Sequence, residues 1–167
     1  MDLTPYIAWI IFIHVLAAFV FAAGHGVSIF VAFQIRRETD RVRMAALLDL
    51  SQLSVLIATI AVIVLFLAGI LAGVVLNSWS RTWIWASLFL LIAIAVSMTP
   101  LGIGHFNRIR VALGQRTRDF KEGQPDPVPA SDEALAAAVA TRRPEQLLAI
   151  GGVGFVVILW LMMFKPF

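Results

Sequence analysis

Four long apolar runs, separated by polar stretches, set the pattern of this chain. They cover roughly residues 6–33, 53–76, 83–106 and 146–164, and none of them contains Lys, Arg, Asp or Glu. An α-helix rises about 1.5 Å per residue, so about 20 apolar residues cross the hydrocarbon core of a bilayer. The pattern therefore predicts an all-α fold, a polytopic four-helix bundle that spans the membrane as a single transmembrane domain.

The polar stretches between the runs differ greatly in length. The connection between the second and third runs is very short, which predicts an antiparallel helix hairpin. The connection of residues 108–145 is the only long one, and three prolines exclude a helix over residues 125–129. Ser131 is a candidate N-cap for a short Ala-rich helix over residues 132–141. Pro144 fits the first turn of the last helix.

Basic residues are distributed very unevenly between the two sides that this topology defines. Of the 13 Lys and Arg, four lie in the first connection and seven in the third, whereas the remaining two are Arg81 and Lys165. Basic residues beside helix ends stay in the cytoplasm. All five Trp fall on the opposite side, where indole rings favour the interface between membrane and water. Both termini are therefore predicted to be extracytoplasmic, the N-terminus to be uncleaved, and the protein to lie in a cell's inner (plasma) membrane.

Composition narrows the chemistry that is available. Of the 167 residues, 60% are hydrophobic and 14% are charged, and cysteine is absent, which excludes disulfides, thiol catalysis and thiolate metal centres. The net charge of +3 belongs to the connections and is explained by topology, so no nucleic-acid partner is expected. The sequence also lacks phosphate-binding loops and the motifs of nucleophilic catalysis. The expected partner is the lipid bilayer.

Three histidines are the main candidates for chemistry, because polar side chains at membrane depth are costly. These are His14, His25 and His105. His14 and His25 are 11 residues apart, which places them on one face of a helix, about 16 Å apart along its axis. Such a pair is typical of a helix that supplies axial ligands to two haem b groups. The simpler alternative is that each imidazole hydrogen-bonds a neighbouring helix.

Depth along the spans indicates which ligands could share one haem. His25 could pair with Met98, which lies closer to its level, or with His105, which lies roughly 5–9 Å deeper. Met98 as ordinary core or lipid-facing packing is the more frequent case. Gly69 of the second run lies near the level of His14, and a glycine there would let a flat ring approach the backbone.

Small residues gather at several points of the spans. Gly69 and Gly73 form a GxxxG pattern, which favours close helix packing and, as a minor alternative, a homo-oligomer. Around His25, around His105 and over residues 151–154, glycines gather toward the same end of the spans. This arrangement predicts either a crevice for a planar ligand or simply close packing of helices.

A resemblance to known proteins rests on three features of the sequence. They are residues 13–18 (IHVLAA), residues 67–71 (LAGIL), and the short loop that leads into Trp83 and Trp85. Together they resemble an uncharacterised bacterial four-helix integral membrane family, similar to copper-resistance D-type proteins and membrane-bound protoporphyrinogen oxidases. The resemblance covers roughly residues 1–110. It implies that His14 would bind haem b.

Two functions from different classes remain open at this point. The first is electron transfer or a haem-linked redox step, with haem iron held by His14, His25 or His105. The second is a non-enzymatic packing partner in the membrane, or a small-solute permease, whose histidines are structural. Whether the protein is an enzyme is left open by the sequence.

Overall fold

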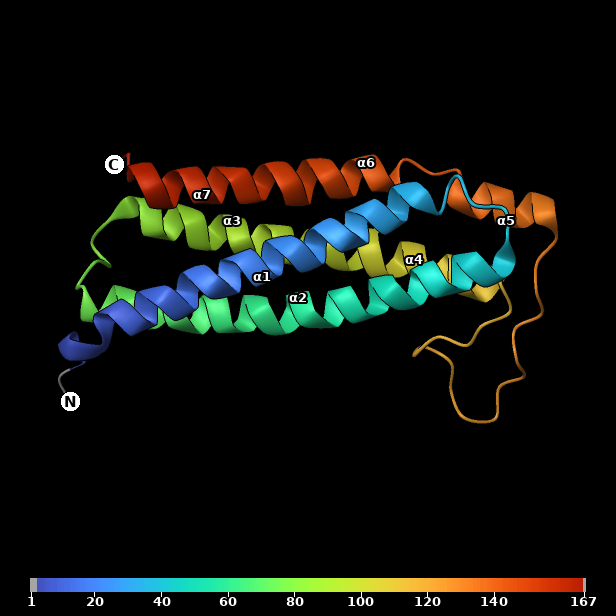
Figure 1. Ribbon diagram of the computed structural model, residues 1–167, viewed down its shortest axis with the longest axis horizontal. Helices are drawn as coiled ribbons and strands as arrows, with labels where there is room; N and C mark the ends of the chain where they lie inside the picture. The colour runs from blue at the N-terminus through green and yellow to red at the C-terminus, as the bar shows by residue number, and fades with distance from the viewer. Residues whose placement is uncertain (1–2, 167) are drawn as a thin grey trace.

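The computed structural model describes residues 3–166, apart from the side chain of Thr99, and all regular structure in this part of the chain is helical. Four long helical segments lie side by side along the long axis of the molecule (Figure 1). Each is long and apolar enough to cross a membrane. The all-α fold and its four apolar helices are thus confirmed.

The first two segments are unbroken α-helices. A short 3-10 turn, Thr4–Tyr6, leads into α1, Ile7–Gln34. After a short loop, the side chain of Asp40 caps α2, Arg41–Val75, by accepting hydrogen bonds from two backbone amides. The predicted span over residues 53–76 is therefore only the apolar part of a longer helix.

The third segment is continuous but changes its pitch in the middle. It consists of α3, Thr82–Met98, a π-helical stretch η2, Thr99–Ile103, and α4, Gly104–Ala112. η2 contains Pro100, which has no N–H to donate within the helix. A π-helical turn is one of the local adjustments by which a membrane helix accommodates a proline.

The fourth segment has a similar construction. α6, Arg143–Leu147, has Pro144 in its first turn, as the sequence predicts. It continues through a second π-helical stretch, η3, Leu148–Val153, into α7, Gly154–Phe164. The third and fourth segments thus share an interruption that the first two lack.

The four segments associate as two antiparallel pairs (Figure 1). α1 packs along α2, and α3 packs along α7. The pairs contact each other mainly at one end of the molecule, through α1 with α6 and η3, and through α2 with α4. Both chain termini lie at the opposite end (Figure 1). We call the end where the pairs meet the connection end, and the end with the termini the terminal end.

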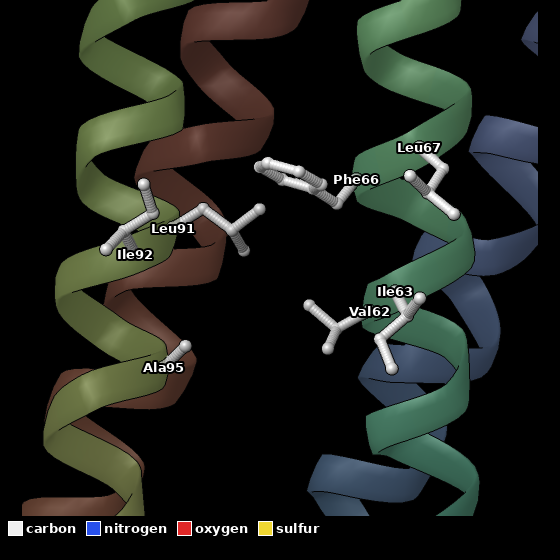
Figure 2. Close-up of a pocket in the computed structure, with 7 residues that line it drawn as sticks. All are labelled: Val62, Ile63, Phe66, Leu67, Leu91, Ile92 and Ala95. Carbon is white, nitrogen blue, oxygen red and sulfur yellow. The ribbon is translucent and has the colours of Figure 1, made fainter.

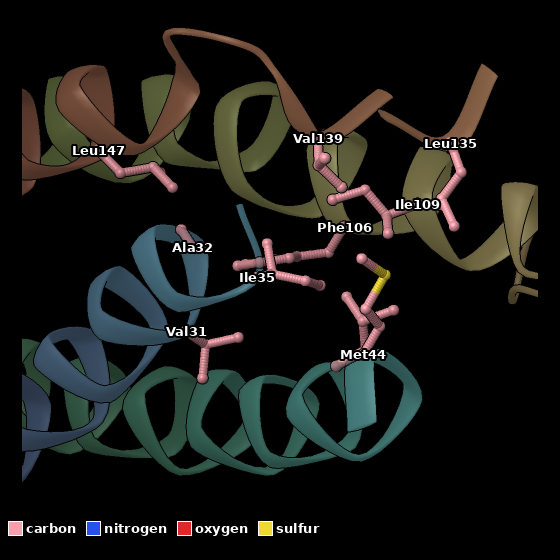
Figure 3. Packing of buried hydrophobic residues seen from close by; sticks show 10 residues of the cluster. Val31, Ala32, Ile35, Met44, Phe106, Ile109, Leu135, Val139 and Leu147 are labelled. Atoms are coloured by element: carbon pink, nitrogen blue, oxygen red, sulfur yellow. The ribbon is translucent and has the colours of Figure 1, made fainter. Parts of the chain in front are cut away.

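A core of buried apolar residues gathers at the connection end (Figure 3). It includes α5, Asp132–Val139, the short helix of the long connection, which Ser131 caps as the sequence predicts. Leu135 and Val139 of α5 lie beside Ile109 of α4 (Figure 3). The long connection is therefore anchored to the bundle by its helix. The core consists of Val31, Ala32, Ile35, Met44, Leu48, Phe106, Ile109, Leu135, Val139 and Leu147.

A seven-residue repeat brings α1 and α2 close together. Ile10, Ala17, Gly24 and Val31 follow one another at this interval on α1, and all four are buried. A Cβ added at Gly24 would lie 2.9 Å from the backbone oxygen of Ser54, so the two backbones approach closely there. A seven-residue repeat is typical of helices that pack with a left-handed twist.

A hydrogen bond between two serine side chains crosses the same interface. The hydroxyl of Ser54 donates to the backbone oxygen of Ser51 at 2.8 Å. The hydroxyl of Ser28 is therefore the donor in the 2.8 Å bond that joins it to Ser54. Ser28 and Ser54 are both buried, so this bond gives Ser28 a partner that it would otherwise lose on leaving water.

Candidate functional site

His14 lies on α1 against the other helix of its pair. Its Nδ1 is 2.9 Å from the backbone oxygen of Leu65 on α2. Because a carbonyl oxygen can only accept, Nδ1 must carry the proton. The ring also lies over Gly69, where an added Cβ would be 2.9 Å from Cε1. The flat ring that Gly69 admits to the α2 backbone is thus the imidazole of His14 itself.

The second ring nitrogen of His14 makes no hydrogen bond within the described part of the chain. Its Nε2 is not among the enclosed nitrogens, unlike the Nε2 atoms of His25 and His105. A neutral imidazole that donates Nδ1–H to a carbonyl presents the lone pair of Nε2. Metal-ligating histidines usually have this arrangement, in which the second ring nitrogen bonds a carbonyl or carboxylate.

Sequence reasoning did not find the Leu65 carbonyl as the partner of His14. The signal for it is Gly69, four residues later in the same helix. A helical side chain covers the turn that precedes it, so a glycine leaves the carbonyl of that turn accessible from the side. The pairing of one histidine with one such carbonyl still depends on how the two helices are rotated, which the sequence does not state.

His25 faces the fourth segment rather than α2. Its Nε2 is enclosed and has no hydrogen-bond partner among the described residues. A Cβ added at Gly151 of η3 would overlap this nitrogen. On its other side the ring is parallel to that of Phe21, with centroids 5.9 Å apart and an interplanar angle of 2°. The imidazole is held between Phe21 and Gly151, and this packing leaves no space for haem iron at Nε2.

His105 is the most buried of the three histidines, with 3% of its surface exposed. It lies beside the core at the connection end, where its ring centroid is 5.5 Å from that of Phe106. Its Nδ1 lies 3.5 Å from the hydroxyl of Thr141, at the limit of a hydrogen bond. Its Nε2 is enclosed and has no partner within the described residues. These contacts join α4 to the segment between α5 and α6.

The structure does not bring the expected haem ligands together as pairs with accessible ligand atoms. Met98 packs against the core at the connection end, and the Nε2 atoms of His25 and His105 are both enclosed. His14 and His25 share a face of α1, yet they contact different helices, α2 and η3. Two stacked haems, or one haem between His25 and either partner, therefore do not fit this packing. Nε2 of His14, by contrast, is not among the enclosed atoms.

Both glycines of the GxxxG pattern are covered by side chains of their own chain. The indole of Trp79 lies over Gly73, where an added Cβ would be 3.1 Å from the ring. Nε1 of Trp85 in turn donates to the backbone oxygen of Trp79 at 2.9 Å. Gly69 lies under His14. A homo-oligomer through these two glycines stays a prediction, and it would require both rings to move aside.

An apolar groove opens between the two helix pairs (Figure 2). Its volume is about 210 Å³. Phe66 and Val62 point from α2 toward α3, and Leu91 points back from α3 (Figure 2). The α2 side of the groove ends two residues before Gly69, on which the ring of His14 lies. The groove is lined by Val62, Ile63, Phe66, Leu67, Leu91, Ile92 and Ala95.

No protein-family model, no curated protein and no solved structure matches this chain. The resemblance of residues 13–18 and 67–71 to a bacterial membrane family therefore stays a prediction. Among the described residues, His, Asp and Glu side chains form no group of three that could hold a metal ion. Function consequently has to be inferred from the geometry of His14 and of its surroundings.

Proposed function

We propose that the protein spans the inner membrane four times, with both termini outside the cytoplasm. Four apolar helices of sufficient length support the four spans, and the position of both termini at one end supports an even number of crossings (Figure 1). The two connections at the opposite end contain 11 of the 13 basic residues. Basic loops stay in the cytoplasm, so the connection end is the cytoplasmic end.

Within that topology, we propose that the protein binds one haem b through His14 and takes part in electron transfer or a haem-linked redox step. One observation carries this proposal. His14 alone of the three histidines has one nitrogen fixed by a backbone oxygen and the other without a hydrogen bond in the described chain and not enclosed. The resemblance noted from the sequence, in which a first-helix histidine is associated with haem b, points to the same residue.

The surrounding residues have separate roles in this proposal. His14 would hold the haem iron through Nε2, and the Leu65 carbonyl fixes the tautomer of the ring, orients it and raises the basicity of Nε2. Gly69 provides the space in which the ring can lie flat against α2. The apolar side chains of Val62 and Phe66 keep the neighbouring groove free of polar groups. A bound haem supplies one-electron chemistry, which no side chain of this sequence offers by itself.

A second candidate function is favoured by the other two histidines. His25 and His105 both use their rings to join helices, and both have an enclosed Nε2. If His14 acts only through its bond to Leu65, all three histidines are structural. The protein would then be a non-enzymatic packing partner in the membrane or a small-solute permease.

An absorbance spectrum of the purified protein separates the two functions. We expect a Soret band that is lost in His14→Ala and retained in His25→Ala and His105→Ala. The matched variant is His14→Gln, whose amide can still donate toward Leu65 but offers no imidazole to iron. A folded His14→Gln protein without the band would assign ligation to His14. A wild-type protein that stays colourless after incubation with excess haem would overturn the haem proposal and leave the structural one.

A further inference from the structure

A cluster of arginines at the connection end has too few carboxylates to neutralise it. Arg36 forms a two-point ion pair with Glu145, with N–O distances of 2.5 and 2.8 Å. This hydrogen bonding raises the pKa of the Arg36 guanidinium above its ordinary value. Arg108, Arg142 and Arg143 form no ion pair with the carboxylates that the structure describes.

The four arginines of this cluster converge although they come from different segments. Arg108 follows His105 by three residues on α4. Arg142 and Arg143 directly follow Thr141, whose hydroxyl lies 3.5 Å from Nδ1 of His105. Arg36 is held in the same region by its ion pair with Glu145, which follows Arg143 by two residues. Among the ion pairs of the described residues, Glu145 is the one carboxylate that pairs with any of these four arginines, and it pairs with Arg36. Most other arginines of the two connections have an acidic partner of their own, in the pairs Arg41–Asp132, Arg43–Asp40, Arg110–Asp49 and Arg116–Asp126.

The helix surface beside the cluster is apolar and uncovered. On the fourth segment, Leu148, Ile150 and Val153 follow Arg143 toward the terminal end, and all three are exposed. On the third segment, Ile103 precedes Arg108 and is exposed as well. Guanidinium groups at the edge of an exposed apolar surface match the division of a phospholipid into a charged headgroup and acyl chains.

We propose that Arg108, Arg142 and Arg143 bind the phosphate of an anionic phospholipid, whose acyl chains lie along the exposed apolar residues of the third and fourth segments. A planar guanidinium can bind two oxygens of one phosphate at once. Basic pockets between membrane helices on the cytoplasmic side are known to bind such headgroups. A free phosphate would use the same guanidinium groups but not the apolar surface beside them. The site rests on the membrane topology and is independent of haem at His14.

Competition between two lipids tests the site directly. The detergent-purified full-length protein is incubated with equal amounts of phosphatidylglycerol and phosphatidylcholine, and the bound lipids are counted by native mass spectrometry. We expect the wild type to retain phosphatidylglycerol preferentially. Arg108→Gln/Arg143→Gln should lower this preference roughly 25-fold, because each basic residue near the headgroups contributes about fivefold. The matched control is Arg118→Gln/Lys121→Gln, which removes the same charge from the long connection and should leave the preference unchanged.

Two further measurements separate guanidinium geometry from charge alone, and a bound lipid from a free phosphate. Arg108→Lys/Arg143→Lys retains the charge but loses the two-point geometry, and we expect a smaller fall in preference than in the Gln variant. The Lys variant also provides the test of the site if the Arg108→Gln/Arg143→Gln variant does not fold. The proposal is overturned if the wild type shows no preference, if both Gln variants fall equally, or if the Lys variant behaves as wild type. Displacement of the lipid by inorganic phosphate, at an ionic strength matched with chloride, would overturn it in favour of a free-phosphate site.

Discussion

The two helix pairs of this molecule reach similar lengths by different construction. α1 and α2 are uninterrupted and meet along a repeat of small residues, with Gly24 against the Ser54 backbone. The third and fourth segments each contain a π-helical stretch, and the second of these brings Gly151 against His25. At Gly24, within the first pair, backbone meets backbone, whereas at Gly151, between the pairs, the backbone meets a side chain. The interface between α1 and α2 should therefore tolerate added side-chain volume less well than the contact between the pairs at Gly151.

The largest expected effect is at Gly24. A Cβ there would lie 2.9 Å from a backbone oxygen, which cannot rotate away. Gly24→Leu should therefore lower the free energy of unfolding by about 3 kcal/mol, because overpacking at a rigid contact forces the helices apart. Thermal unfolding in mild detergent measures this change.

Gly26 provides the matched control for this comparison, because an added Cβ would meet no atom within 4 Å there. Gly26→Leu should change the free energy of unfolding by no more than about 0.5 kcal/mol. Equal losses in the two variants would show that the repeat on α1 is not the contact that holds the first pair together.

A smaller effect is expected at Gly151, in the contact between the pairs. Gly151→Ala should cost about 1–2 kcal/mol of unfolding free energy, since the added methyl group overlaps a ring that can partly shift. Removing that ring should recover most of the loss, so the double variant Gly151→Ala/His25→Ala should be less than additive. Gly104→Ala is the control, because a Cβ there meets nothing within 4 Å. If the losses of unfolding free energy in the two single variants simply add in the double variant, the contact between Gly151 and His25 is contradicted.

The smallest effect is expected for the hydrogen bond between Ser28 and Ser54 across the first pair. Ser28→Ala removes the 2.8 Å bond to Ser54 and should cost about 0.6 kcal/mol, the average for hydrogen bonds between membrane helices. Ser97→Ala in the other pair is the control, because the Ser97 hydroxyl bonds its own helix at the Ala93 oxygen. Chemical unfolding of both variants in detergent should resolve the difference. A larger loss of unfolding free energy for Ser97→Ala than for Ser28→Ala would contradict this prediction.

The elements could be predicted where local rules decide them. Apolar runs locate the four long helices, Ser131 locates the start of α5, and Pro144 falls in the first turn of the last segment. The start of α2 at Arg41 lies well before its apolar run, because its first turns are buried in the core of this protein rather than in lipid. Pro100 lacks the N–H that a regular helix needs and so explains an interruption of the third helix, but a proline alone does not specify the π-helical form.

The candidate site could be predicted only in part. Depth along the helices places His14 near Gly69, and the two are in contact. Depth does not reveal rotation, so it could not show that His25 faces Gly151 or that His105 faces Thr141. Rotation of α1 is fixed by the seven-residue repeat that includes Ala17 and Gly24, which the apolar pattern of the first run conceals because nearly every position in that run is apolar.

The position of the core at the connection end has a consequence for biosynthesis. Leu48 and Leu147 both belong to it, although about a hundred residues of chain separate them. A ribosome adds about 5–20 residues per second, so roughly 5–20 s pass between the synthesis of these two residues. During that interval α1 and α2 can already pair, but the apolar residues at their shared end lack α5 and α6. A nascent chain that stops before Leu135 therefore leaves this end of the hairpin uncovered, where quality-control proteases can recognise it.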